Sequence, residues 1–306
     1  MFITGGSQGL GLALAKLAAS KGANVVVCSR TESKLQTAVR EIEACASPSQ
    51  KISYIAADVS SFDGAKAALA NADAPDLVVC CAGGAKPGFF LEQEEADFEL
   101  ALRTDYWTAL STAHAAAGAM VRGGVRGRVV FVSSVLGFMG FVGYAQYSPM
   151  KYAIRGLAEC LRSELLPHGI HVHAFFPATI LSPGYEQENT TKPEVTKAVE
   201  GADEGLTPEQ CATQLLRGVE RDEFFIADGF VGRTLRMCSS GTAPGNGPFL
   251  LELFAGMLAR VRGARRSGAD GRWLWRGGAG SRRTGPWCST ALRQDARRER
   301  ALALLM

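Results

Sequence analysis

The chain has 306 residues, of which 47% are hydrophobic, and its formal net charge is +3. This length and apolar content exclude an intrinsically disordered protein and are sufficient for a sizeable buried core. The charge is unevenly distributed, because residues 262–306 contain eleven arginines and only three acidic residues. The eight cysteines show neither C-x-x-C pairs nor the spacing of metal ligands, so we expect free thiols and no metal site.

Short β-branched runs alternate with amphipathic stretches over the first 235 residues. Such alternation is typical of a parallel sheet whose strands are connected by crossover helices. The sequence therefore predicts one doubly wound α/β domain of the Rossmann type at residues 1–235, with a parallel sheet of about seven strands. The expected strands are Met1–Ile3, Asn24–Cys28, Ile52–Ala57, Asp76–Cys81, Arg128–Ser133, His171–Phe176 and Glu223–Ala227. Helices are expected near residues 9–21, 32–45, 62–70, 94–120, 144–166 and 207–221.

The alternation stops after residue 235. Pro248–Val261 is apolar but has 14 residues, whereas a helix that spans a bilayer needs roughly 20. We therefore expect the segment 236–261 to associate with a membrane surface or to pack on the protein itself. Residues 262–306 are rich in Gly, Arg and Trp and have no periodicity, which predicts a basic, disordered extension without a nucleic-acid partner.

A glycine-rich turn follows the first expected strand, with the spacing T-G-x-x-x-G-x-G over Thr4–Gly11. Glycines let backbone N–H groups approach a pyrophosphate, and the N-terminus of the following helix favours its negative charge. The candidate cofactor-binding residues of this turn are Gly5, Ser7, Gln8, Gly9 and Gly11. The turn also contains G-x-S-x-G, the nucleophile-elbow pattern of α/β-hydrolases, but Ser7 has too little chain before it for the strands and oxyanion loop of that fold.

The second expected strand is followed by Arg30. An acidic residue at this point would bind a ribose 2′-hydroxyl, whereas an arginine accommodates a 2′-phosphate. Arg30, together with Lys34, therefore predicts NADPH rather than NADH as the cofactor. Asp58 follows the third expected strand, where its carboxylate could accept a hydrogen bond from the adenine amine. The alternatives are a solvated arginine and an aspartate that caps the next helix.

Polar residues with acid–base chemistry surround the start of the long helix expected after the fifth strand. Tyr147 and Lys151 are four residues apart, so that on a helix they share one face. A phenol is a poor acid–base group at neutral pH, and a nearby ammonium favours its charged form. Ser134 ends the preceding strand, where its hydroxyl could hold the carbonyl oxygen of a substrate.

The glycine turn, Ser134 and the Y-x-x-x-K pair together resemble the short-chain dehydrogenase/reductase family over about residues 1–235. The resemblance implies an NADPH-dependent oxidoreductase in which Ser134 and Tyr147 polarise and protonate a ketone. It implies that Lys151 binds the nicotinamide ribose and lowers the pKa of the tyrosine, and that Ile180 lies where the family closes over the nicotinamide carboxamide.

Two positions depart from the family pattern. Asp105 stands where the family usually has an asparagine that acts largely through its backbone carbonyl and a relay water, and it is our fourth candidate catalytic residue. Cys80 and Cys81 stand where the family usually has two asparagines, so the side-chain hydrogen bonds of those residues are expected to be lost. An inactive cofactor-binding scaffold is therefore one alternative, although the intact Ser134, Tyr147 and Lys151 argue against it.

Four segments further resemble one group within the family, the 3-ketodihydrosphingosine reductases: residues 3–11, 130–134, 153–159 and 182–193. This resemblance implies reduction of a long-chain sphingoid ketone, 3-ketodihydrosphingosine, to dihydrosphingosine in sphingolipid biosynthesis. It also implies work at the cytosolic face of the endoplasmic reticulum membrane, with a membrane surface and a second copy of the chain as candidate partners. Reduction of another lipid carbonyl, such as a steroid or retinoid, stays an alternative because the whole family shares the catalytic residues.

Overall fold

The computed structural model describes residues 1–70, 74–201 and 205–239. The predicted interfacial segment Pro248–Val261 and the predicted basic extension 262–306 lie outside these residues. The boundary expected at residue 235 falls inside a helix, α10 (Gly229–Ser239).

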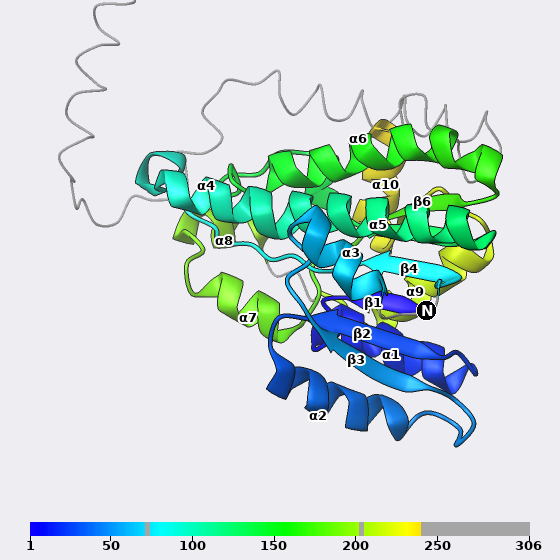
Figure 1. Cartoon of the computed structure of the whole chain (residues 1–306). Helices are drawn as coiled ribbons and strands as arrows, with labels where there is room; N and C mark the ends of the chain where they lie inside the picture. Colours follow the sequence, from blue (N-terminus) through cyan, green and yellow to red (C-terminus); the bar gives the residue numbers. More distant parts are fainter. Residues whose placement is uncertain (71–73, 202–204, 240–306) are drawn as a thin grey trace, which may run out of the picture. The chain divides into compact units, whose positions relative to one another are not determined.

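The core of the molecule is one sheet of seven parallel strands in the order β3-β2-β1-β4-β5-β6-β7 (Figure 1). The strands are β1 (Phe2–Thr4), β2 (Val25–Ser29), β3 (Ile52–Ala56), β4 (Leu77–Cys80), β5 (Arg128–Val132), β6 (His171–Phe176) and β7 (Phe225–Ala227). The predicted Rossmann-type sheet is therefore confirmed. Because the chain leaves β1 toward β2 and later returns to place β4 on its other side, a crevice is expected beyond the carboxyl ends of β1 and β4.

Helices cover both faces of the sheet (Figure 1). On one face lie α1 (Gly9–Ser20), α2 (Glu32–Glu43) and α9 (Pro208–Glu220). On the other lie α3 (Phe62–Ala70), α5 (Thr108–Gly123) and α6 (Ser148–Leu165). Successive residues of a strand point to opposite faces of the sheet and pack into different hydrophobic cores. Val130 packs in the core with α1 and α9, whereas Phe131 packs in the core with α5 and α6. This double burial explains why the strands are apolar on consecutive residues.

The helix predicted near residues 94–120 consists of three parts. α4 (Glu95–Ala101) continues into a π-helix at Leu102–Trp107, which leads directly into α5. The helix predicted near residues 144–166 begins at Ser148, four residues later than expected. Pro149 lies in the first turn of this helix, α6, where proline is favoured.

Three helices were not predicted from the sequence: α7 (Pro183–Asn189), α8 (Glu194–Glu200) and α10. The hydroxyl of Ser182 caps α7, and Pro183 follows at the first helical position. This Ser-Pro pair is a helix-start signal, but seven residues are too few for a clear hydrophobic period. α7 and α8 follow β6 and therefore stand at the carboxyl edge of the sheet.

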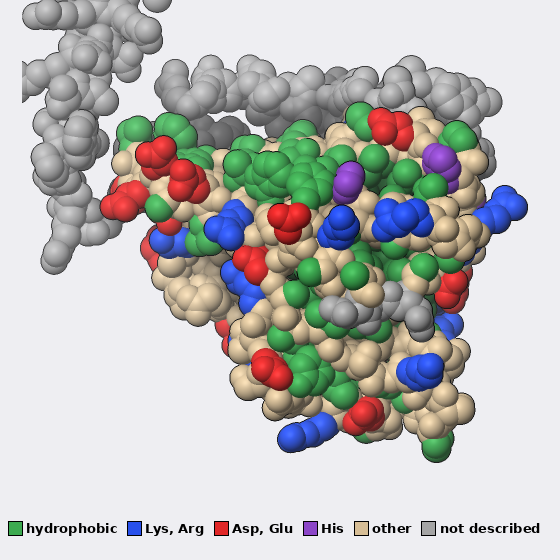
Figure 2. Space-filling view, viewed as in Figure 1, with side chains coloured by type: hydrophobic (Ala, Val, Ile, Leu, Met, Phe, Trp, Pro, Cys, Tyr) green, Lys and Arg blue, Asp and Glu red, His purple; other side chains and the backbone are tan. Residues whose placement is uncertain are grey.

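One face of the molecule carries hydrophobic side chains over α4, α5 and α6 (Figure 2). Exposed apolar side chains of these elements and of the π-helix between them include Leu100, Leu102, Trp107, Val121 and Tyr152. Association with a second copy of the chain stays a prediction. Within the described residues, no helix is both long enough and apolar enough to cross a membrane.

Candidate active site

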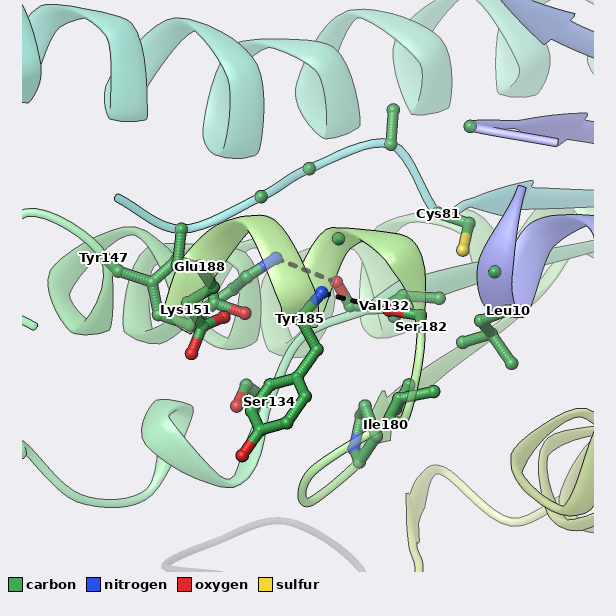
Figure 3. Close-up of a pocket in the computed structure, with 18 of the residues that line it drawn as sticks. Leu10, Cys81, Val132, Ser134, Tyr147, Lys151, Ile180, Ser182, Tyr185 and Glu188 are labelled. Atoms are coloured by element: carbon green, nitrogen blue, oxygen red, sulfur yellow. Dashed lines mark hydrogen bonds between the residues drawn. The ribbon is translucent and has the colours of Figure 1, made fainter. Parts of the chain in front are cut away.

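A cleft of about 1530 Å³ opens at the carboxyl ends of the strands. Its walls come from the turn after β1, from the segments that follow β2 to β6, and from α7, α8 and α10. Every candidate site residue named from the sequence lines this cleft except Asp105, which lies fully buried behind it. Figure 3 draws part of the wall, where α7 faces the residues that follow β5.

The glycine turn is folded as a dinucleotide site requires. Gly5 and Gly9 adopt φ angles of +67° and +55°, a region that side chains other than glycine rarely enter. A Cβ on Gly5 would lie 2.9 Å from the backbone of Ala82, and one on Gly11 would collide with the carbonyl oxygen of Gly5. The turn thus brings bare backbone against the cleft at the start of α1, and these residues fit the pyrophosphate of a nicotinamide dinucleotide.

Thr4 ties this turn to the neighbouring strand. Its hydroxyl accepts hydrogen bonds from the backbone N–H groups of Cys81 (3.1 Å) and Ala82 (3.3 Å) and donates to the carbonyl of Val79 (3.4 Å). β1 and β4 are therefore cross-linked by a side chain although Cys80 and Cys81 replace the expected asparagines. Cys80 is buried, whereas Cys81 is only half-buried and lines the cleft. The sequence placed Thr4 in the glycine motif but gave no sign of this cross-link.

The part of the cleft that follows β2 carries two basic side chains. Arg30 is exposed directly after β2, and the ammonium of Lys34 lies 3.2 Å from the side-chain oxygen of Gln8. Asp58 accepts a hydrogen bond from the backbone N–H of Ser60 (3.0 Å). Hydrogen bonds from Ser60, with the nearby charges of Arg103 and Arg30, hold the pKa of Asp58 below its usual range. The adenine contact proposed for this carboxylate stays a prediction.

Ser134, Tyr147 and Lys151 meet on the cleft wall (Figure 3). Ser134 follows β5 and caps a short 3-10 turn, where its oxygen accepts a hydrogen bond from the N–H of Leu136 (3.2 Å). Tyr147 immediately precedes α6, one turn before Lys151. The Lys151 ammonium lies 5.1 Å from the centre of the Tyr147 ring. The spacing that suggested a shared helix face therefore brings phenol and ammonium together.

The Tyr147 phenol is a protonated group in this environment. Burial raises its pKa to about 12, and the carboxylates of Asp105 and Glu188 act in the same direction. The charge of Lys151 and the hydrogen bond with Ser134 lower the pKa and oppose these effects. At neutral pH the side chain therefore carries a proton that it can donate.

Lys151 is a buried cation with a direct counter-charge. Its ammonium lies 3.0 Å from Oδ1 of Asp105 and donates a hydrogen bond to the carbonyl of Val132 (3.4 Å). Burial by itself lowers the pKa of Lys151, but Tyr147 and Asp105 raise it above its ordinary value. The resemblance implies that the family's asparagine at this position acts largely through its backbone carbonyl, whereas the carboxylate side chain of Asp105 pairs with the lysine.

Asp105 lies within the π-helix at Leu102–Trp107, a feature that frequently occurs at functional sites. The backbone N–H of Gly84 donates to Oδ1 of Asp105 (3.2 Å). A Cβ on Gly83 would lie 2.5 Å from the same oxygen, so that only glycine leaves room for the ion pair. This arrangement was not foreseen, since π-helices leave no sequence pattern that we could use.

Ile180 and α7 form the opposite wall. Ile180 pairs with Leu206 in a parallel bridge and lines the cleft, as expected for its place after β6 (Figure 3). A Cβ on Gly9 would lie 3.3 Å from the Cβ of Ser182, so the start of α7 rests against the glycine turn. The helix thereby closes the cleft between the cofactor turn and Tyr147.

A polar cluster beside Tyr147 was missed from the sequence. The hydroxyl of Tyr144 donates to Glu188 and lies 3.1 Å from Glu200, and both carboxylates contact the ammonium of Lys192. The i, i+4 spacing of Glu188 and Lys192 was the available signal. Among the described residues, no group of three potential metal ligands is arranged to hold an ion.

Comparisons with known proteins place the chain in a family. The short chain dehydrogenase family matches residues 1–193. A 3-ketodihydrosphingosine reductase of Cryptococcus neoformans is 41% identical over 257 residues, which cover 82% of this chain and 76% of that protein. A 3-ketodihydrosphingosine reductase of Dictyostelium discoideum is 34% identical over 277 residues, covering 85% of this chain and 82% of that protein.

The fold has close counterparts among solved structures. A short-chain dehydrogenase from Sphingobium yanoikuyae in complex with NADPH superposes with a TM-score of 0.66 at 21% identity, over 87% of this chain and 93% of that chain. At this identity the likeness concerns the fold alone. The family match and the two relatives carry the assignment: the chain belongs to the short-chain dehydrogenase/reductase family and is an oxidoreductase.

Proposed function

We propose that the protein reduces 3-ketodihydrosphingosine to dihydrosphingosine with NADPH, a step of sphingolipid biosynthesis. The observation that carries the proposal is the meeting of Ser134, Tyr147 and Lys151 in a cleft whose opposite wall is α7, the segment that most resembles such reductases. The names of relatives at 34% and 41% identity support the same substrate.

The side chains have roles that match this reaction. The hydroxyls of Ser134 and Tyr147 can both donate hydrogen bonds to the ketone oxygen. NADPH held by the glycine turn and Arg30 would supply the hydride for the carbonyl carbon, and the Tyr147 phenol would give its proton to the oxygen, which yields a secondary alcohol. The Lys151 ammonium stabilises the phenolate left behind, and Asp105 holds that ammonium in place.

The cleft has a wall for a long alkyl chain. Met139, Phe141 and Val199 line it beyond Tyr147, and α10 contributes Phe230 and Val231. Phe230 is 85% exposed and Val231 is 59% exposed, although both are large apolar side chains. An apolar rim of this kind suits a lipid that projects from the protein.

We also propose that the enzyme works at a membrane surface, on the cytosolic face of the endoplasmic reticulum. The alkyl chain of the substrate partitions into lipid, because each buried CH₂ group contributes about 0.8 kcal/mol. Phe230 and Val231 at the rim would contact the acyl chains and let the substrate pass directly from the bilayer into the cleft.

The substrate is tested by following NADPH oxidation with purified full-length protein. We expect turnover of 3-ketodihydrosphingosine with a kcat/KM at least about tenfold higher than for steroid and retinoid carbonyls, because only a long linear chain matches the apolar rim. Equal or higher kcat/KM for a steroid or retinoid would assign the enzyme to another lipid carbonyl, and NADPH binding without any turnover would favour the scaffold alternative.

Tyr147→Phe should lower kcat by about 10²- to 10⁴-fold, because it removes the proton donor. The dissociation constant for NADPH, measured by fluorescence titration, should stay within about twofold of the wild type. Tyr152→Phe is the matched control, since Tyr152 lies on the same helix, is exposed, and does not line the cleft. A Tyr147→Phe variant with wild-type kcat would assign the proton to another group.

Arg30→Ala should weaken NADPH binding by about 1.5–3 kcal/mol, the range for a charge-assisted contact with the 2′-phosphate. NADH affinity should hardly change, because NADH lacks that phosphate. Arg40→Ala removes an arginine from α2 that does not line the cleft and serves as the control. Equal losses for NADPH and NADH would mean that Arg30 supports the fold rather than the phosphate.

Membrane contact is tested by sedimentation with phosphatidylcholine vesicles. Replacing Phe230 and Val231 together by serine should lower the vesicle-bound fraction several-fold, because the rim loses its apolar surface. Val121→Ser changes an exposed apolar residue of α5 away from the cleft and should leave binding unchanged. If the double variant binds vesicles as the wild type does, the rim is not the membrane contact.

A further inference from the structure

An ionic cluster lies between α7, α8 and the loop before α6. The ammonium of Lys192 is 3.2 Å from Oε1 of Glu188 and 2.8 Å from Oε2 of Glu200. The Tyr144 hydroxyl donates to Glu188 and lies 3.1 Å from Oε1 of Glu200, and the Lys192 ammonium lies 4.7 Å from the centre of the Tyr185 ring. The Lys192 side chain is 1% exposed, whereas that of Glu188 is 20% exposed.

This cluster carries an unbalanced negative charge. One ammonium serves two carboxylates, and across residues 1–70, 74–201 and 205–239 no other lysine or arginine forms an ion pair with Glu188 or Glu200. Tyr144 and Lys192 both contact Oε1 of Glu188. The Glu188 side chain is 20% exposed and lines the cleft, so its carboxylate is accessible to a ligand there.

The position of Glu188 places this charge at the reacting centre. Glu188 lines the cleft, and its side chain lies in one group with those of Tyr147 and Lys151 (Figure 3). The hydroxyl of Tyr144 donates to Glu188, and the Tyr144 ring centre lies 5.9 Å from that of Tyr147, so the carboxylate lies near the phenol. A ketone that accepts the Tyr147 proton therefore has its neighbouring carbon atoms close to Glu188.

We propose that Glu188 recognises the ammonium group that the substrate carries on the carbon next to its ketone. This inference rests on the proposed function, since 3-ketodihydrosphingosine is an α-amino ketone. A charge-assisted hydrogen bond from the ammonium to the Glu188 carboxylate would balance the charge of the cluster. A lipid ketone without the amine would leave a partly desolvated carboxylate unpaired, and sites of this kind reject analogues that lack the bonding group.

The same contact couples recognition to proton transfer. In the free enzyme the negative charge of Glu188 raises the pKa of Tyr147, which makes the phenol a weaker acid. A substrate ammonium bound to Glu188 offsets that charge, so the phenol becomes a stronger acid when an amino ketone is bound. Amine-free ketones lack this compensation, and both their binding and their protonation are less favourable.

The test compares two ketones, 3-ketodihydrosphingosine and 1-hydroxyoctadecan-3-one, which has the same chain, ketone and hydroxyl but no amine. The full-length wild type should prefer the amino ketone in kcat/KM by about 10- to 100-fold, a range typical of a lost charged hydrogen bond. Glu188→Gln should lower kcat/KM for the amino ketone by a similar factor and leave the amine-free ketone unchanged or faster.

Glu200→Gln is the matched control. It removes the other partner of Lys192 and a partner of Tyr144, so it should lower the melting temperature about as much as Glu188→Gln does. It should lower the preference for the amino ketone less than Glu188→Gln does, because the carboxylate of Glu188 remains although the cluster loses one negative charge. NADPH binding by both variants reports that the cofactor half of the cleft is intact.

The outcomes separate this inference from the proposed function. If the wild type reduces neither ketone, the proposed function fails and the inference fails with it. If the wild type reduces both ketones with equal kcat/KM, Glu188 does not recognise the amine and the inference is wrong. The wild-type measurements alone give this result. Equal losses for both ketones in Glu188→Gln would make Glu188 a structural residue, and the inference alone would be wrong.

Discussion

The buried ammonium of Lys151 is the constraint on which the site depends. An isolated buried charge costs several kcal/mol, so the fold must supply partners for it. The carboxylate of Asp105 at 3.0 Å and the carbonyl of Val132 at 3.4 Å are those partners. Asp105 lies in a π-helix, and Gly83 leaves space for its contact with the lysine. With this pair in place, Tyr147 stands one turn before a fixed positive charge.

Parallel topology brings the remaining parts to the same edge. The glycine turn follows β1, Arg30 follows β2, Ser134 follows β5 and Ile180 follows β6. All of these strands point the same way, so their carboxyl ends open into one cleft. The Thr4 hydroxyl cross-links β1 and β4 at the centre of that edge and compensates for the two cysteines that replace the expected asparagines.

Two buried lysines with carboxylate partners line the cleft and differ in their charge balance. Lys151 has one carboxylate, Asp105, and that pair is neutral. Lys192 lies between Glu188 and Glu200, and that cluster keeps a negative charge. The first pair supports the phenolate that forms during reduction, whereas the second offers a place for a substrate cation. The proposed specificity of α7 and α8 would thus reside in a different ionic cluster of the cleft from the one that supports proton transfer.

The sequence by itself determined whatever depends on local spacing. Strand periodicity predicted the seven-stranded sheet, the glycine spacing predicted the turn after β1, and the interval between Tyr147 and Lys151 predicted their approach. The tertiary structure alone decided the Asp105–Lys151 ion pair and the cluster around Lys192. Their members come from separate elements, and their contacts depend on a π-helix and on how α7 and α8 pack, for which no residue pattern exists. Long-range contacts between charged side chains are set by packing, and packing is a property of the whole fold.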